Sequence, residues 1–238
     1  MATSPSAVDI RGARGGSERS SRGSIGYAGA VRDTALVAGV LLASLGYAVV
    51  RYNVFAGVSH EHVSVFVANK AISVGALVLI GISGLVAGPA RRKALGLVGL
   101  VLAVTHVLLS LLVLDRAYLP AQYLPDGTLR ALAEGSMLAG AIATALLLWR
   151  GGASGMRVQA PRHGRSLLPG VGRTALALVA LHTLALGGRG WLEPGAWPGG
   201  MPPITLLTFG MALLFCVAPR RQSTRAARSP ARVVASGP

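Results

Sequence analysis

Six long apolar stretches, separated by short segments that hold almost all of the charge, constrain this chain more than any other feature. A helix needs about 20 apolar residues to span a bilayer, with a range near 17–25. The sequence therefore predicts an all-α integral membrane protein, a bundle of six transmembrane helices. The predicted spans are Thr34–Val50, Ala71–Ala90, Ala94–Leu114, Ala131–Trp149, Ser166–Gly188 and Pro203–Ala218.

The composition agrees with this class. Hydrophobic residues make up 52% of the chain and charged residues 13%, whereas soluble domains carry about 25% charged residues. The formal net charge of +15 would also suit a nucleic-acid-binding protein. The basic residues, nearly all Arg, instead sit at the ends of the apolar stretches, which is the positive-inside pattern. We therefore expect the lipid bilayer, and not nucleic acid, to be the partner of this charge.

The loops alternate between Arg-rich and mixed or nearly neutral. The Arg-rich set comprises both termini, Arg91–Lys93 and Arg150–Arg173, and the other set comprises Arg51–Lys70, Asp115–Arg130 and Arg189–Met201. The positive-inside rule then predicts that both termini are cytoplasmic, in a multi-pass protein of the inner (plasma) membrane. The expected domains are a disordered basic tail over 1–30, the transmembrane domain over 31–219 and a second disordered basic tail over 220–238.

Two histidines lie inside predicted spans, where ionisable residues are costly and suggest function. His106 precedes Asp115 in the third span, and His182 precedes Arg189 in the fifth. At 1.5 Å per residue, the two imidazoles lie roughly 14 and 11 Å from the outer ends of their spans. Both spans run from inside to outside, so the two histidines are predicted at nearly the same depth.

Small residues precede each histidine at helical spacing. They are Gly96, Gly99 and Ala103 before His106, and Gly172, Ala175 and Val179 before His182. This pattern leaves room for a flat, bulky group between the helices. Imidazole is a common axial ligand of haem iron, and helical bundles hold cofactors between facing helices. We therefore predict that His106 and His182 bind the metal of one b-type haem.

Two other interpretations stay open. Small residues also line ordinary transmembrane helix interfaces, where a histidine can hydrogen-bond a neighbouring helix. The chain would then be a haem-free polytopic membrane protein, a transporter subunit or an assembly factor, with the two histidines as packing groups. Alternatively, it is a quinone-linked subunit whose partner does the chemistry.

The same residues resemble the ferric reductase-like transmembrane domain family. That family includes six-span metalloreductases, NADPH oxidases and the haem-binding membrane subunit of the bacterial methionine sulfoxide reductase system. Its pattern is a basic pair, then Leu-Gly, then a histidine later in the third helix, matched here by Arg91–Leu97 and His106. The family's fifth helix contributes the partner histidine, matched by His182. The resemblance covers about residues 34–218 and implies an oxidoreductase or its membrane subunit.

Two departures from the family refine this expectation. Two-haem members carry a second histidine on each of these helices, and this chain has none there, which implies one haem per chain in the outer half of the membrane. Many relatives also append a flavin and nicotinamide domain, and this sequence has no glycine-rich dinucleotide motif after a strand. The electron donor is then expected to be a separate flavin- or quinone-linked protein, or a membrane quinol.

Weaker signals lie near the outer face. Glu134 opens the fourth span and is interpreted as a helix cap, and His60 and His62 are spaced to share one side of an extended loop as a possible metal site, although a solvated loop is the simpler interpretation. Three outer basic residues are candidates to pair with haem propionates: Arg51, Lys70 and Arg189.

Overall fold

The computed structural model describes residues 15–58, 63–155 and 164–219, and side chains over 29–58, 65–152 and 170–219. Two compact units make up the chain, Met1–Gly39 and Val40–Pro238. The first unit contributes the beginning of α1, which starts at Gly15. This start lies inside the predicted tail over 1–30, and no proline interrupts the chain between 15 and 49.

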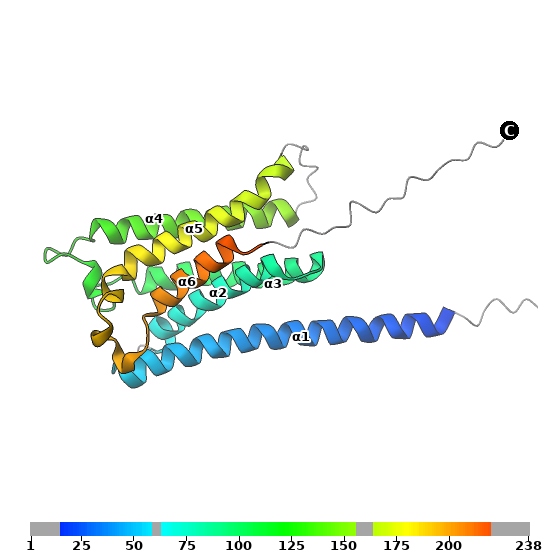
Figure 1. Ribbon diagram of the computed structural model, residues 1–238, viewed down its shortest axis with the longest axis horizontal. Helices are drawn as coiled ribbons and strands as arrows, with labels where there is room; N and C mark the ends of the chain where they lie inside the picture. Colours follow the sequence, from blue (N-terminus) through cyan, green and yellow to red (C-terminus); the bar gives the residue numbers. More distant parts are fainter. Residues whose placement is uncertain (1–14, 59–62, 156–163, 220–238) are drawn as a thin grey trace, which may run out of the picture. The chain divides into compact units, whose positions relative to one another are not determined.

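Throughout the described ranges the secondary structure is helical, apart from an isolated β-bridge. Six helical segments are long and apolar enough to cross a membrane, which confirms the predicted multi-pass membrane protein. The main helices, drawn in Figure 1, are α1 (Gly15–Val49), α2 (Ala68–Leu85), α3 (Pro89–Leu112), α4 (Ala131–Gly155), α5 (Gly164–Trp191) and α6 (Ile204–Val217). Shorter helical segments are η1 (Val50–Phe55), η3 (Val63–Val67), η4 (Pro120–Gln122), η5 (Pro194–Ala196) and η6 (Pro198–Gly200).

Several span boundaries differ from those predicted. The first span continues past Val50 as the π-helix η1, so Arg51 lies within it. The second span begins earlier and includes Lys70, so these two basic residues do not bound the apolar helices. α2 also ends before the predicted Ala90, because Gly88 adopts a φ of 90° and the chain turns into α3 there.

Within the larger unit, α2 packs along α3, α5 packs between α4 and α6, and α6 also packs on α2 (Figure 1). Small residues permit these close approaches. The Phe215 ring from α6 fills the space where a side chain at Gly81 of α2 would stand. Thr205 of α6 and Trp191 of α5 do the same at Gly187. The helices thus form a bundle in which α3 packs mainly against α2, and α5 packs against α4 and α6.

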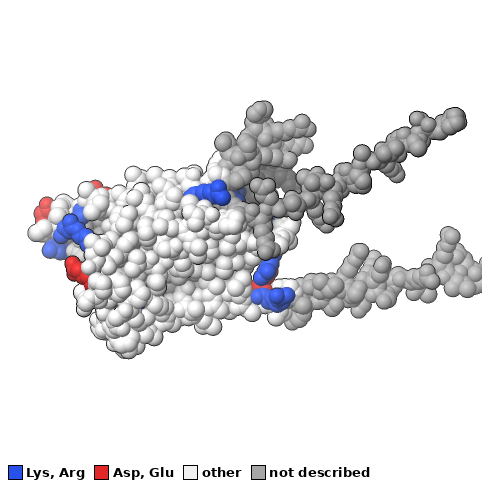
Figure 2. Space-filling view, viewed as in Figure 1, with Lys and Arg blue, Asp and Glu red and all other residues white. Residues whose placement is uncertain are grey.

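Charge in the larger unit gathers at its two ends. The face drawn in Figure 2 shows a wide uncharged surface between them, as expected for a surface that faces lipid. One end holds the start of α3 and the end of α4, and its described charged residues are Arg91, Arg92, Lys93, Arg150 and Arg173. All described acidic residues of this unit lie at the other end: Asp115, Asp126, Glu134 and Glu193. This is the segregation that the loop pattern predicts.

Candidate functional site

A cavity of about 300 Å³ opens between α3 and α5, and both His106 and His182 line it. Its walls come from α2, α3, α4, α5 and α6, and most of the lining side chains are apolar. Among the described residues, α3 and α5 do not form a close-packed pair, although each packs on other helices. The two histidines singled out in the sequence therefore line one ligand-sized space.

His106 is oriented by a side chain from the neighbouring helix. Its Nδ1 lies 2.6 Å from Asn69 Oδ1, and Asn69 Nδ2 donates to Ser110 Oγ at 3.1 Å. Because an amide oxygen only accepts hydrogen bonds, His106 Nδ1 must carry the proton and donate it. Asn69 is only 3% exposed, so this contact is sheltered from water and stiffens the imidazole between α2 and α3.

His182 is oriented mainly by main-chain atoms of α4. Its Nδ1 donates to the Ser136 carbonyl oxygen at 2.8 Å and lies 2.9 Å from Ser136 Oγ. Ser136 Oγ in turn donates to the His182 carbonyl oxygen at 3.0 Å, and Ser136 is fully buried. A carbonyl oxygen also only accepts, so this imidazole again carries its proton on Nδ1.

Both imidazoles are therefore held in the same tautomer, with the proton on Nδ1 and a lone pair on Nε2. In the part of the chain that the structure describes, no hydrogen bond occupies either Nε2. A histidine that binds a metal usually donates its other ring N–H to a fixed acceptor, which sets its orientation and raises its basicity. The site thus offers two pre-oriented nitrogen donors to a ligand in the cavity.

The small residues before each histidine are divided between two roles. Ala103, Ala175 and Val179 line the cavity, as the sequence predicts. Gly99 instead faces α2, where an added Cβ would stand 2.8 Å from Ile80 Cγ1. Gly96 likewise faces Ser83 of α2, so the inner part of the α3 stripe serves helix packing and does not provide room for a ligand.

The sequence does not single out Asn69, Ser136 and Gly140, which complete the site. Gly140 of α4 lies against the His182 ring, where an added Cβ would be 3.1 Å from Nδ1. Asn69 is visible in the sequence as an amide two residues before the predicted second span, which is the one available signal. Ser136 and Gly140 give no comparable signal, because small residues occur throughout the spans.

The three basic residues predicted to pair with haem propionates have three different environments. Lys70 lines the cavity. The Arg51 guanidinium is buried and donates to the Met201 carbonyl oxygen, while Arg189 is exposed at the end of α5. Glu134 lies exposed in the first turn of α4 and does not line the cavity, as suits a residue near a helix N-terminus.

His60, His62 and His163 lie outside the described residues, so the possible metal site of the first outer loop stays a prediction. Over the described ranges, no group of three or more His, Cys, Asp and Glu side chains forms a metal cluster. Among the described His, Cys, Asp and Glu side chains, only His106 and His182 line the cavity.

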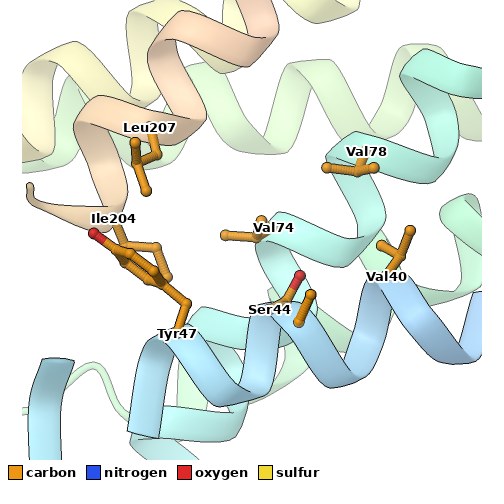
Figure 3. Close-up of a pocket in the computed structure, with 8 residues that line it drawn as sticks. Val40, Ser44, Tyr47, Val74, Val78, Ile204 and Leu207 are labelled. Carbon is orange, nitrogen blue, oxygen red and sulfur yellow. The ribbon is translucent and has the colours of Figure 1, made fainter. Parts of the chain in front are cut away.

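A second hollow, of about 250 Å³, opens between α1, α2 and α6 (Figure 3). Its lining is apolar except for Ser44 and Tyr47, and the Tyr47 hydroxyl donates to the Pro202 carbonyl oxygen at 2.6 Å. No histidine lines it. This hollow differs from the histidine cavity in having no metal donor and no charged residue.

No protein-family model and no curated protein matches this chain, so its ferric reductase-like resemblance stays a prediction carried by the residues around His106 and His182.

Proposed function

We propose that this protein transfers electrons across the membrane through one b-type haem bound between α3 and α5, with His106 and His182 as axial ligands. The observation that carries the proposal is the pair of imidazoles on one cavity, each with Nδ1 bonded and Nε2 free. Two packing histidines need no shared cavity and no matching tautomers. A bis-imidazole site needs both.

The donor set fits a haem. Neutral imidazole nitrogens from two helices suit a low-spin iron, and the porphyrin supplies the remaining ligands. The cavity lining is mostly apolar, as a buried porphyrin requires, and Gly140 leaves the His182 ring room on the α4 side. The fit thus rests on ligand chemistry, orientation and lining together.

A haem at this site supplies one-electron chemistry, which the amino acids alone do not. His106 and His182 would hold the haem iron through Nε2, while Asn69 and Ser136 hold the imidazole rings through Nδ1. The apolar walls keep water from the site and so favour electron transfer over side reactions. No residue of the site is assigned an acid–base step.

The proposal includes an orientation with both termini in the cytoplasm of a cell whose inner (plasma) membrane holds the protein. Its support is the basic end of the bundle, which contrasts with the mixed charge of the other end. A reporter fused at Gly127 should then report the outside, and fusions at both termini should report the cytoplasm. A cytoplasmic signal at Gly127 would reverse the orientation. The donor is proposed to be a separate flavin- or quinone-linked protein, or a quinol.

One observation favours a second candidate, a haem-free membrane protein. Both histidines make short hydrogen bonds between helices, as packing histidines would. A hydrogen bond through Nδ1 alone satisfies that role. The candidates differ in what they predict for Nε2, which only the haem proposal uses.

The deciding experiment is a spectrum of the protein purified in detergent. Reduced-minus-oxidised difference bands of a six-coordinate b-type haem are expected, and a pyridine haemochrome assay against protein concentration should give one haem per chain. Protein that stays colourless, also after incubation with haemin, would rule out the proposal. A ratio near two would show that other ligands are in use.

A further inference from the structure

Lys70 is the one charged side chain on the histidine cavity among the residues that the structure describes. It follows Asn69 in the first turn of α2, so one turn of helix both orients His106 and brings an ammonium group to the cavity. The Nζ atom of Lys70 lies over the Phe66 ring, 5.2 Å from the centroid.

This cation has no acidic partner at the cavity. None of the described acidic residues lines it, and no hydrogen bond or ion pair of the Lys70 ammonium occurs within the described ranges. A charged amine facing an apolar membrane cavity is costly unless an anion or a hydrogen-bond acceptor meets it. The missing partner must come from what the cavity binds.

The other two outer basic residues do not meet this description. The Arg51 guanidinium donates to the Met201 carbonyl oxygen and does not line the cavity. Arg189 is exposed at the end of α5 and does not line the cavity. Position and lack of a partner therefore single out Lys70.

We infer that Lys70 is the anion-binding residue of this cavity and pairs with a carboxylate of the ligand held by His106 and His182. The inference rests on the proposed function, in which that carboxylate is a haem propionate. Lys70 then fixes the rotational setting of the porphyrin, because two axial imidazoles alone leave the ring free to turn about their common axis. It is a positioning residue that contacts the cofactor's edge and does not ligate the iron.

The test compares the affinities of two ligands for the wild-type protein and for its variants. Protein freed of haem is reconstituted with haem or with haem dimethyl ester, whose propionates carry no charge, and affinity is measured by absorbance titration. The wild-type protein should prefer haem over the ester by about tenfold or more, because the ester leaves the Lys70 ammonium without an anionic partner. Lys70→Met should bind both ligands with equal affinity, and Lys70→Arg should keep the preference.

Arg189→Met is the matched control, because it removes an outer cation that does not line the cavity. It should discriminate between the two ligands as the wild type does. A Lys70→Met protein that still prefers haem tenfold would overturn the inference while leaving bis-histidine ligation standing. Should Lys70→Met not fold, equal affinity of the wild type for the two ligands would overturn it as well.

The two proposals fail differently. If the wild type binds neither ligand, the haem proposal falls and takes this inference with it. If the wild type forms six-coordinate complexes of equal affinity with both, only the role of Lys70 is wrong. The reduction potential of haem bound to Lys70→Met is a second measurement. It should be lower than in the wild type, because loss of a nearby positive charge disfavours the reduced state. A tenfold change in that equilibrium corresponds to about 59 mV for one electron.

Discussion

The two sides of the cavity hold their histidines by different means. On the α2–α3 side, a side-chain amide accepts from His106, and on the α4–α5 side a main-chain carbonyl accepts from His182. A side-chain acceptor is lost by one substitution, whereas a main-chain acceptor persists as long as its helix does. The proton on Nδ1 of His106 thus depends on the identity of the residue at position 69 of α2. The proton on Nδ1 of His182 depends only on the position of the α4 backbone at Ser136.

The two sides also differ in free space. At His182, Gly140 lies so close that an added Cβ would be 3.1 Å from Nδ1 and 3.4 Å from Cε1. At His106, the nearest polar atoms belong to Asn69 and Ser110, which fill the space with hydrogen-bonding groups. We therefore expect the α3 side to be sensitive to loss of polarity and the α5 side to be sensitive to added volume.

Removal of either imidazole should have the largest effect on haem binding. The effect should be equal on the α3 side and on the α5 side, because the proposed site needs both ligands. His106→Ala and His182→Ala should each lose haem or leave a five-coordinate iron with a changed absorption spectrum. The double variant should be little worse than either single variant, because residues of one site are not additive. Haem content and difference spectra measure this.

His60→Ala and His62→Ala are the controls, since both lie in the sequence between the first two membrane spans, and they should leave the haem spectrum intact. Full haem content in both His106→Ala and His182→Ala would make the haem-free protein the better account. Replacing either histidine would then lower the free energy of unfolding by only about 0.6–2 kcal/mol, because each would lose one independent interhelical hydrogen bond.

Loss of the Asn69 amide should have the next largest effect, confined to the α3 side. Asn69→Leu keeps the approximate shape but removes the acceptor of His106 Nδ1–H and the donor to Ser110 Oγ. Loss of such an outer hydrogen bond typically costs 10–100-fold in metal affinity. Haem titration of the purified variant should show a loss in this range.

Asn53→Leu is the matched control for this change. Asn53 also donates through its amide, to the Val58 carbonyl oxygen at 2.9 Å, but it lies in η1 and does not line the cavity. Equal losses in both variants would mean that Asn69 acts through general stability and not through His106.

Added volume at Gly140 should affect the α5 side by a smaller amount. Gly140→Ala places a methyl group against His182 Nδ1, so the ring must shift by a few tenths of an ångström. Overpacking costs about 1–3 kcal/mol, and alanine in a helix recovers about 0.5–1 kcal/mol relative to glycine. The net expectation is a loss of roughly fivefold in haem affinity.

Gly135→Ala separates the local effect from the general helix effect. Gly135 lies on the same helix with nothing within 4 Å of an added Cβ. This variant should keep wild-type haem affinity and gain slight stability. If both alanine variants bind haem alike, the His182 ring is not constrained from the α4 side.

The sequence predicts well those features that depend on one helix at a time. Charge spacing predicts six spans, and the described residues form six helices long and apolar enough to cross a membrane. Counting residues predicts that His106 and His182 belong to one site, and both line one cavity. Span ends are less predictable, because Arg51 and Lys70 look like boundaries but lie within helical spans. Long basic side chains tolerate this position when their polar groups reach an acceptor or a cavity.

Features that depend on how neighbouring helices are rotated about their own axes cannot be predicted from the pattern of a single helix. Asn69 and Ser136 become the partners of the histidines only when α2 packs on α3 and α4 on α5. For the same reason, Gly99 looks like part of a cofactor stripe in the sequence but faces Ile80 of α2 in the structure. One sequence without an alignment carries no record of which faces meet.

The smallest effect is expected for Ser136→Ala, and it tests the comparison of the two sides most directly. This change removes the hydroxyl that donates to the His182 carbonyl oxygen and lies 2.9 Å from Nδ1, but it leaves the Ser136 carbonyl oxygen at 2.8 Å. His182 therefore keeps its acceptor and its tautomer. The loss should be about 0.6 kcal/mol, roughly threefold in haem affinity, clearly below that of Asn69→Leu. If Ser136→Ala instead matches Asn69→Leu, the hydroxyl and not the main chain orients His182, and both sides of the cavity then depend equally on side-chain identity.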